Sequence, residues 1–200
     1  MSLLLTAFEP FGGETVNPAQ QAVESLTVPG VQKLILPVEY GRAAAIVTDA
    51  ITRLSPRAVI CVGQAGGRSG ITPEKYAVNL RRAKAPDNAG VLYDGQPIVP
   101  GGEERLESSF GAERIAQALS EAGISAYVSE SAGTFVCNDV MYSVLKHLSG
   151  SKVPAGFIHV PFCSAQAAGH PGAFTMSTEE IAWGLAIAVE CVFALLKDGE

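Results

Sequence analysis

The sequence is poor in charge and in aromatic side chains. Charged residues make up 17% of its 200 positions and aromatic residues 7%, with one tryptophan and three histidines. Its 14 basic residues are outnumbered by 20 acidic ones and form no basic run, so we expect neither nucleic acid nor an anionic membrane surface as a partner. No apolar run approaches the about 20 residues of a membrane-spanning helix, and the start of the chain lacks a positively charged signal region. We therefore expect a cytoplasmic protein.

Cysteine is also scarce. The four cysteines are Cys61, Cys137, Cys163 and Cys191, and in a reducing compartment we expect all of them as free thiols. None stands with a histidine at a spacing typical of zinc sites. The sequence thus predicts no metal and no organic cofactor.

Hydrophobic residues, by contrast, are plentiful, at 48% of the chain. This composition predicts one globular domain over residues 1–200. Apolar, β-branched runs predict strands at 3–8, 33–38, 58–63 and 156–161, and helical spacing predicts helices at 18–25, 43–54, 137–149 and from Thr178 onward. Because strands and helices alternate, we expect an α/β fold: a three-layer α/β/α sandwich around a mostly parallel mixed sheet.

The middle of the chain breaks this alternation. Residues 72–80 predict a strand or hairpin arm, and residues 83–102, rich in glycine, proline and aspartate, predict a long connection that covers the site. Residues 103–122 predict a helix interrupted near Gly111, and residues 126–129 a short strand.

Cys137 lies where that short strand should give way to a helix, in the segment SAGTFVCND of residues 131–139. Unpaired N–H groups and the positive end of the dipole at a helix start favour a thiolate over a thiol. A buried structural cysteine is the plainer interpretation. The Gly133 turn, the helix start and a histidine on the next strand favour a nucleophile.

That histidine is His159, near the carboxyl end of a predicted buried strand, which is the end where open α/β sheets place their sites. A pair of Cys137 and His159 would need a third group to orient the imidazole. Spacing does not choose among the candidate acids, which are Glu74, Asp87, Asp94 and Asp139.

Three segments together resemble pyrrolidone carboxyl peptidase, the pyroglutamyl peptidase I family of cysteine peptidases. They are FEPFGGETVNP at residues 8–18, CVGQAGGR at 61–68 followed by ITPE at 71–74, and the Cys137 segment. The resemblance implies a catalytic triad of Glu74, His159 and Cys137, peptides with N-terminal pyroglutamate as substrates, and a homo-oligomer, either dimer or tetramer. It extends to about residue 162.

The resemblance also implies a substrate pocket. A 5-oxoproline ring is uncharged, so its pocket should combine aromatic walls with a few amide hydrogen bonds. Without the resemblance, Phe8 and Phe11 would be interpreted as core aromatics and Gln64 as a loop amide. The residues expected to bind substrate are Phe8, Phe11, Asn17, Gln64, Lys84, Phe135 and Val136.

Three positions depart from the family pattern. Ala7 stands where glycine is usual, and Lys84 stands where members carry an arginine, so the charge is kept but the two-pronged guanidinium is lost. Cys163 follows the predicted His159 strand in place of the usual residues and offers a second candidate thiol.

Two other functions stay open at the level of sequence. One is a nucleoside phosphorylase-like transferase that uses Gly12 and Gly13 as a phosphate loop, although Glu9 and Glu14 flank this turn. The other is a non-enzymatic thiol-based sensor, in which Cys137 is oxidised reversibly.

Overall fold

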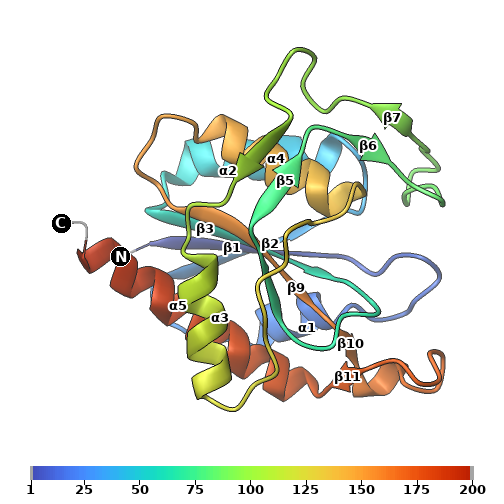
Figure 1. The fold of residues 1–200 in the computed structure, drawn as a ribbon, viewed down its shortest axis with the longest axis vertical. Helices are drawn as coiled ribbons and strands as arrows, with labels where there is room; N and C mark the ends of the chain where they lie inside the picture. Colours follow the sequence, from blue (N-terminus) through green and yellow to red (C-terminus); the bar gives the residue numbers. More distant parts are fainter. Residues whose placement is uncertain (1, 199–200) are drawn as a thin grey trace.

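A five-stranded sheet forms the centre of the computed structural model, which describes residues 2–198 (Figure 1). Its strands follow the order β2-β1-β3-β9-β4, where β4 pairs antiparallel with β9 and the other pairs are parallel. The strands are β1 (Leu3–Phe8), β2 (Val31–Leu36), β3 (Ala58–Gln64), β4 (Thr72–Glu74) and β9 (Ala155–Val160). Every residue of β1, β3 and β9 is buried, as continuous apolar runs require. The predicted mostly parallel mixed sheet is confirmed.

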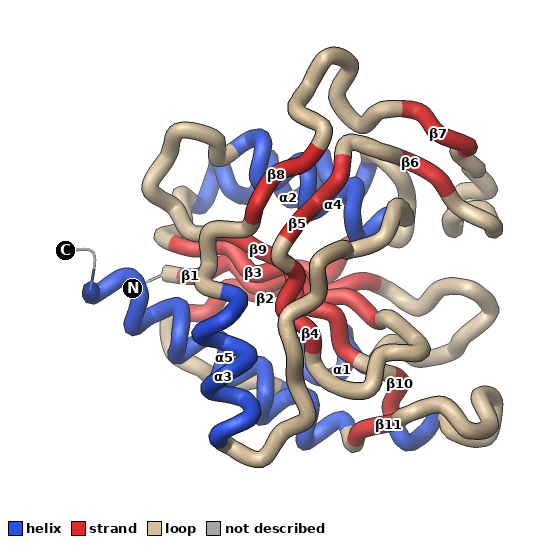
Figure 2. The backbone as a smooth tube through the Cα atoms, viewed as in Figure 1, coloured by secondary structure: helices blue, strands red, loops and turns tan. Residues whose placement is uncertain are grey.

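Helices cover both faces of this sheet (Figures 1 and 2). On one face lie α1 (Pro18–Ser25), α3 (Ala112–Glu121) and α5 (Thr178–Asp198), whose buried side chains share one hydrophobic cluster. On the other lie α2 (Arg42–Leu54) and α4 (Val136–His147), with a second cluster. Asn17 caps α1, because its side chain accepts a hydrogen bond from the Ala19 N–H at 3.0 Å. The three layers are those that the alternating pattern predicts.

An excursion of short strands leaves the sheet after β4. It contains β5 (Tyr76–Val78), β6 (Arg81–Arg82), β7 (Asp94–Gln96) and β8 (Arg105–Glu107). β5 pairs with β8 and β6 with β7, both antiparallel, so the long connection does contain a hairpin. Figure 2 shows these strands extending beyond the sheet on the side of α2 and α4.

Two local predictions are wrong. Residues 103–111 are not helical, because 105–107 pair with β5, and α3 begins only after Gly111, whose φ of 79° suits glycine. Residues 126–129 form no strand: they contact the β4 segment only through isolated bridges at Ile71 and Glu74. For residues 105–107, pairing with β5 outweighs the local helical pattern. The sequence favours Thr178 as the capping residue of the final helix, but Thr178 is already helical. The capping hydroxyl is that of Ser177, which accepts from the Glu180 N–H at 3.0 Å.

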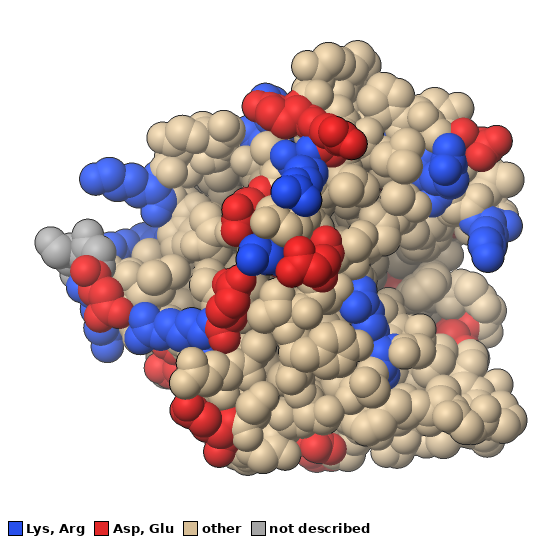
Figure 3. All heavy atoms as spheres, in the orientation of Figure 1, with Lys and Arg blue, Asp and Glu red and all other residues tan. Residues whose placement is uncertain are grey.

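Short elements follow β9: β10 (Phe162–Cys163), the 3₁₀ helix η1 (Ser164–Gln166) and β11 (Thr175–Met176). Between residues 2 and 198, no helix has the length and apolar character needed to span a membrane. On the face drawn in Figure 3, Lys and Arg side chains are interspersed with Asp and Glu.

Two buried polar residues fix the start of α4 to the excursion. The Asn138 amide accepts from the Val78 N–H and donates to the carbonyls of Val78 and Leu80, at 2.9 to 3.1 Å. The fully buried Asp139 carboxylate accepts from Arg81 and from the Gly41 N–H, both at 2.7 Å. Because these residues directly follow Cys137, they determine where its backbone lies.

We expect Arg81→Met to lower the free energy of unfolding by about 3 kcal/mol, because it leaves the buried Asp139 carboxylate without its cation. Urea unfolding followed by circular dichroism measures the change. Arg53→Met is the matched control: Arg53 pairs with Asp49 at 2.8 Å, but both side chains are exposed, so the loss should stay within about 0.5 kcal/mol. Equal losses in the two variants would contradict this account of the Asp139 pair.

Candidate active site

Cys137 is the second residue of α4, at the carboxyl edge of the sheet. Gly133, with a φ of 77°, makes the turn before it, and Phe135 precedes the helix in an extended conformation. The thiol approaches β3 closely: a Cβ added to Gly63 would lie 2.8 Å from the Cys137 sulfur. A glycine at position 63 therefore makes room for the thiol.

His159 lies beside Gly63, because β3 and β9 pair in the register Gly63 to His159. Its Nδ1 is 2.7 Å from Glu74 Oε1 on β4, and both side chains are buried. A carboxylate can only accept, so Nδ1 carries the proton and Nε2 is left as an acceptor. The Phe157 ring packs against the imidazole, with centroids 4.8 Å apart. The imidazole is thus held in the tautomer that can accept a proton from a thiol.

Arg68 is a member of this site that sequence reasoning did not single out. Its guanidinium donates to Glu74 Oε1 at 3.0 Å, to the Ser129 hydroxyl at 2.8 Å and to the Ser131 carbonyl at 3.0 Å. It therefore joins the buried carboxylate to the segment that leads into Cys137. Its position in the motif at residues 61–68 was the only available signal.

Among the four candidate acids, Glu74 is the one that contacts His159. Asp139 binds Arg81, and Asp87 accepts from the Tyr40, Ala89 and Val91 N–H groups, which orders its own loop. Asp94 is exposed and faces Arg82 at 3.7 Å. Of the four, Glu74 is therefore the acid in a position to orient the imidazole.

A cleft holds Cys137 and His159 together with Phe11, Gln64 and Arg68. A narrow pocket leads off it beside the thiol, and its walls include six of the seven residues expected to bind substrate, with Val38 as a further member. The six are Phe8, Phe11, Asn17, Gln64, Phe135 and Val136. Most of these walls are aromatic or aliphatic, and the side chains enclose only about 10 Å³.

Lys84, the seventh, is not in that pocket. It is exposed and lines a neighbouring hollow of about 370 Å³, which shares Phe11 and Phe135 with the pocket. Of the other two departures, Ala7 is buried in the core on the α1 side of the sheet, so its methyl group is accommodated. Cys163, the second candidate thiol, is buried and lines neither the cleft nor the pocket.

The ionisation of Cys137 differs from the sequence-based expectation. Burial raises the pKa of the Cys137 thiol to about 12, and the Glu74 carboxylate adds to the increase, whereas a backbone hydrogen bond opposes it. Desolvation of a thiolate therefore outweighs the stabilising effect of the helix start. Cys137 rests as a thiol, so a base must remove its proton.

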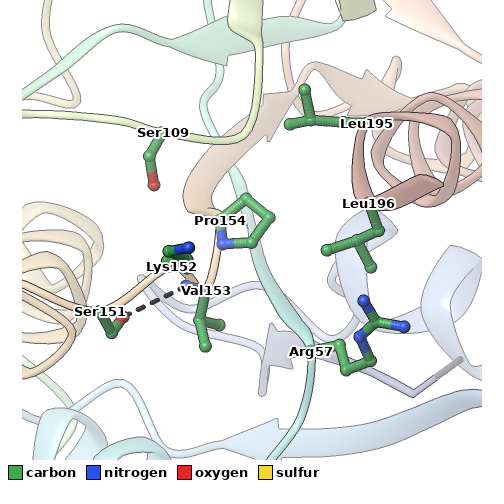
Figure 4. Close-up of a pocket in the computed structure, with 8 residues that line it drawn as sticks. All are labelled: Arg57, Ser109, Ser151, Lys152, Val153, Pro154, Leu195 and Leu196. Atoms are coloured by element: carbon green, nitrogen blue, oxygen red, sulfur yellow. Dashed lines mark hydrogen bonds between the residues drawn. The ribbon is translucent and has the colours of Figure 1, made fainter. Parts of the chain in front are cut away.

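A second hollow, of about 400 Å³, lies at the opposite edge of the sheet, where β3 and β9 begin (Figure 4). Its lining includes Arg57, Ser109, Lys152 and Leu196, and Figure 4 shows the Ser151 hydroxyl bonded to the backbone of Val153. It contains no cysteine or histidine. Of these two sites, the cleft at the carboxyl edge is the one with a cysteine and a histidine among its lining residues.

A thiol at a helix start, an imidazole on the adjacent strand and a carboxylate behind it are the groups that cysteine peptidases use. The family model described as pyroglutamyl peptidase matches residues 1–194. The chain belongs to the pyroglutamyl peptidase family.

Individual relatives agree. The chain is 44% identical to a pyrrolidone-carboxylate peptidase of Chromobacterium violaceum, over 98% of this chain and 95% of the relative. Its fold matches the crystal structure of pyroglutamyl peptidase I from Bacillus amyloliquefaciens with a TM-score of 0.92 and 37% identity, covering 96% and 94% of the two chains. A Pyrococcus furiosus pyrrolidone carboxyl peptidase matches with a TM-score of 0.92 and 36% identity, over 98% and 100%. These relatives give no support to a nucleoside phosphorylase-like transferase or a thiol sensor.

We expect alkylation of Cys137 by iodoacetamide to speed up about tenfold for each pH unit from about pH 6 to about pH 10, because only the thiolate reacts and the raised pKa keeps its fraction small. Mass spectrometry of the Cys137 peptide follows this thiol apart from the other three. A fast rate that levels off near neutral pH would contradict the raised pKa and indicate a preformed ion pair with His159.

Proposed function

We propose that Cys137, His159 and Glu74 carry out the reaction of this family, the removal of an N-terminal pyroglutamyl residue from peptides. The Cys137 sulfur attacks the carbonyl carbon of that residue while its proton passes to His159 Nε2. The resulting oxyanion is stabilised by the Cys137 backbone N–H, and loss of one such donor typically costs about 3 to 4 kcal/mol.

The tetrahedral intermediate then collapses. The bond between the carbonyl carbon and the peptide nitrogen breaks, and the imidazolium returns its proton to the leaving amine. A water molecule, deprotonated by His159, attacks the thioester, and 5-oxoproline and the free thiol are released. Glu74 stabilises the imidazolium that forms in both halves of the reaction.

Burial gives Glu74 its effect. Its side chain is 0% exposed, and its Oε2 makes no hydrogen bond to any residue between 2 and 198. A carboxylate so poorly solvated interacts strongly with a cation that forms beside it. Arg68, at 3.0 Å from Oε1, pairs with this carboxylate and holds it in position.

The narrow pocket beside Cys137 is the proposed site for the 5-oxoproline ring. Aromatic walls suit an uncharged ring, and the Gln64 and Asn17 amides supply the few polar contacts. Because the present space of about 10 Å³ is nearer the size of one water molecule than of a ring, Phe11 or Phe135 must shift as the ring enters. Lys84 lies beyond these two rings, where it acts through its charge, not through contact with the ring.

The observation that carries this function is the buried hydrogen bond between Glu74 and His159, in the same cleft as Cys137. We expect Cys137→Ala to abolish hydrolysis of a pyroglutamyl aminocoumarin amide with the fold retained. We expect Glu74→Gln to lower kcat/KM by about 10³ to 10⁴, because a neutral amide neither fixes the tautomer nor stabilises the imidazolium.

Glu113→Gln is the control for Glu74→Gln, since Glu113 is exposed and pairs with Lys75 on the surface at 3.1 Å. Fluorescence of the released aminocoumarin gives the rates, and circular dichroism tests folding. Activity that persists in Cys137→Ala but is lost in Cys163→Ala would overturn the assignment of the nucleophile. An unchanged kcat/KM in Glu74→Gln would remove that residue from the mechanism.

We further propose that the protein works as a homo-oligomer in the reducing cytoplasm. A catalytic thiol needs a reducing compartment to stay active. The outer face of α5 supports an interface: Trp183 is 53% exposed beside a hollow of about 490 Å³ lined by Ala186, Ile187 and Cys191.

Trp183→Glu should shift the protein to a smaller species in sedimentation equilibrium, because a charge would have to be buried at the interface. Leu92→Glu is the control, since Leu92 is 55% exposed on the excursion, away from α5. Wild-type protein that sediments as a monomer would refute the oligomer proposal.

A further inference from the structure

The amide of Gln166 lies behind the ring pocket and is part of a buried hydrogen-bond chain that the catalytic mechanism does not use. Gln166 ends the short helix η1, and its Oε1 accepts from the backbone N–H of Cys163 at 3.1 Å. Its Nε2 donates to Glu14 Oε2 at 3.1 Å and to Gln64 Oε1 at 3.2 Å. Both glutamine side chains are buried.

Two neighbours fix which way round the Gln166 amide lies. The Cys163 N–H can only donate, so the Gln166 oxygen must face it. The Glu14 carboxylate can only accept, so the Gln166 nitrogen must face Glu14. Glu14 is held by His170, whose Nε2 is 2.7 Å from Glu14 Oε1, and hydrogen bonds from Gln166 and His170 lower the pKa of Glu14. The Gln166 amide therefore cannot flip to exchange the positions of its oxygen and nitrogen.

The orientation of the Gln166 amide determines the orientation of the Gln64 amide. Because Gln166 presents a donor, the Gln64 oxygen is the acceptor and its Nε2 is turned away from Gln166. Gln64 Nε2 makes no hydrogen bond within residues 2–198 and is not among the buried unpartnered atoms of that part of the chain. Since Gln64 lines both the pocket and the cleft, its N–H groups are free to meet a ligand there.

The second amide in the pocket, that of Asn17, also has its oxygen occupied by a hydrogen bond. Asn17 Oδ1 accepts from the Ala19 N–H at 3.0 Å, and Asn17 Nδ2 donates once, to the Glu9 carbonyl at 3.1 Å. Both amide oxygens are therefore engaged, whereas amide hydrogens remain available. Apart from Cys137, the rest of the wall consists of phenylalanine and valine side chains. The pocket thus offers donors to its ligand and no carboxylate.

Resting on the proposed function, we propose that Gln166 is a positioning residue for substrate specificity: it holds Gln64 with its Nε2 toward the pocket, so that the enzyme recognises the ring carbonyl oxygen of the pyroglutamyl residue. The ring N–H contributes less in this arrangement. A ring without that carbonyl leaves a buried donor unpaired, which is the basis of strong discrimination.

Three aminocoumarin amides test this. Their acyl groups are 5-oxoprolyl, 3-oxocyclopentanecarbonyl, which keeps the ring carbonyl but lacks the N–H, and cyclopentanecarbonyl, which lacks both. The carbonyl preference is the ratio of kcat/KM for the second amide to that for the third. For the wild-type enzyme we expect a ratio of about ten or more, the value of one hydrogen bond to an otherwise unpaired donor.

The test variant exchanges acid and amide, as Glu14→Gln with Gln166→Glu. The new carboxylate at 166 still accepts from the Cys163 N–H, but it can now only accept from Gln64, which must turn its oxygen toward the pocket. The new amide at 14 still accepts from His170. Net charge is unchanged. We expect the carbonyl preference to fall to about one or below, because two oxygens then face each other, while kcat/KM for the cyclopentanecarbonyl amide changes little.

A matched control exists on α3, where Gln117 donates to Glu121 at 2.8 Å on the exposed surface. The same exchange there, Gln117→Glu with Glu121→Gln, should leave the carbonyl preference at its wild-type value. Gln166→Leu is a second test. Without a donor to fix Gln64, the carbonyl preference should fall to a value between that of the wild type and that of the exchanged variant.

Several results would overturn the proposal. A carbonyl preference that survives the exchange in a folded protein would mean that Gln166 does not orient Gln64. An equal fall for all three amides would indicate a merely structural role. Turnover of the 5-oxoprolyl amide with neither carbocyclic amide cleaved would place recognition on the ring N–H. Failure of the wild type with all three would refute the proposed function itself, and the proposal with it.

Discussion

The hydrogen bond between Glu74 and His159 is the interaction on which the rest of the site depends. It joins the last residue of the short antiparallel strand β4 to the adjacent strand β9, deep enough that neither side chain is solvated. A buried carboxylate is costly unless it is paired, and Arg68 supplies the pair from a loop at the end of β3. The guanidinium also reaches Ser129 and Ser131, so the group that pairs with Glu74 also holds the segment that leads to Cys137. Arg68 thus links the position of Glu74 to the position of the segment before Cys137.

A second constraint acts on Cys137 itself. Burial keeps the thiol protonated at rest, so the helix start alone does not activate it. In the proposed mechanism, the imidazole oriented by Glu74 removes the thiol proton. This proton transfer requires a fixed position for the thiol. Asn138 and Asp139 fix the start of α4 by binding the excursion, and Gly63 leaves space for the sulfur. Residues 76–107 thus hold the start of α4 in place, although none of their strands belongs to the central sheet.

Much of this could be predicted from the sequence, for identifiable reasons. Continuous apolar runs predicted β1, β3 and β9, and helical spacing predicted α1, because these signals are local. Cys137 and His159 stood out because a glycine turn, a helix start and a strand end are also local. Glu74 came only from the resemblance, and Arg68 and Gln166 were not singled out, because a surface residue and a buried partner look alike until distant segments meet. Residues 105–107 were misassigned for the same reason, since their pairing partner lies almost thirty positions earlier.

An acid quench during turnover would show whether Cys137 becomes acylated with the help of the Glu74 and His159 pair. Protein mixed with an activated 5-oxoprolyl ester, stopped within the first turnover and digested, would be analysed by mass spectrometry. The account predicts one 5-oxoprolyl group in thioester linkage on the Cys137 peptide, present in wild type, absent from Cys137→Ala and much slower to form in Glu74→Gln. An adduct on Cys163, or product release with no acylated cysteine at any time, would contradict it.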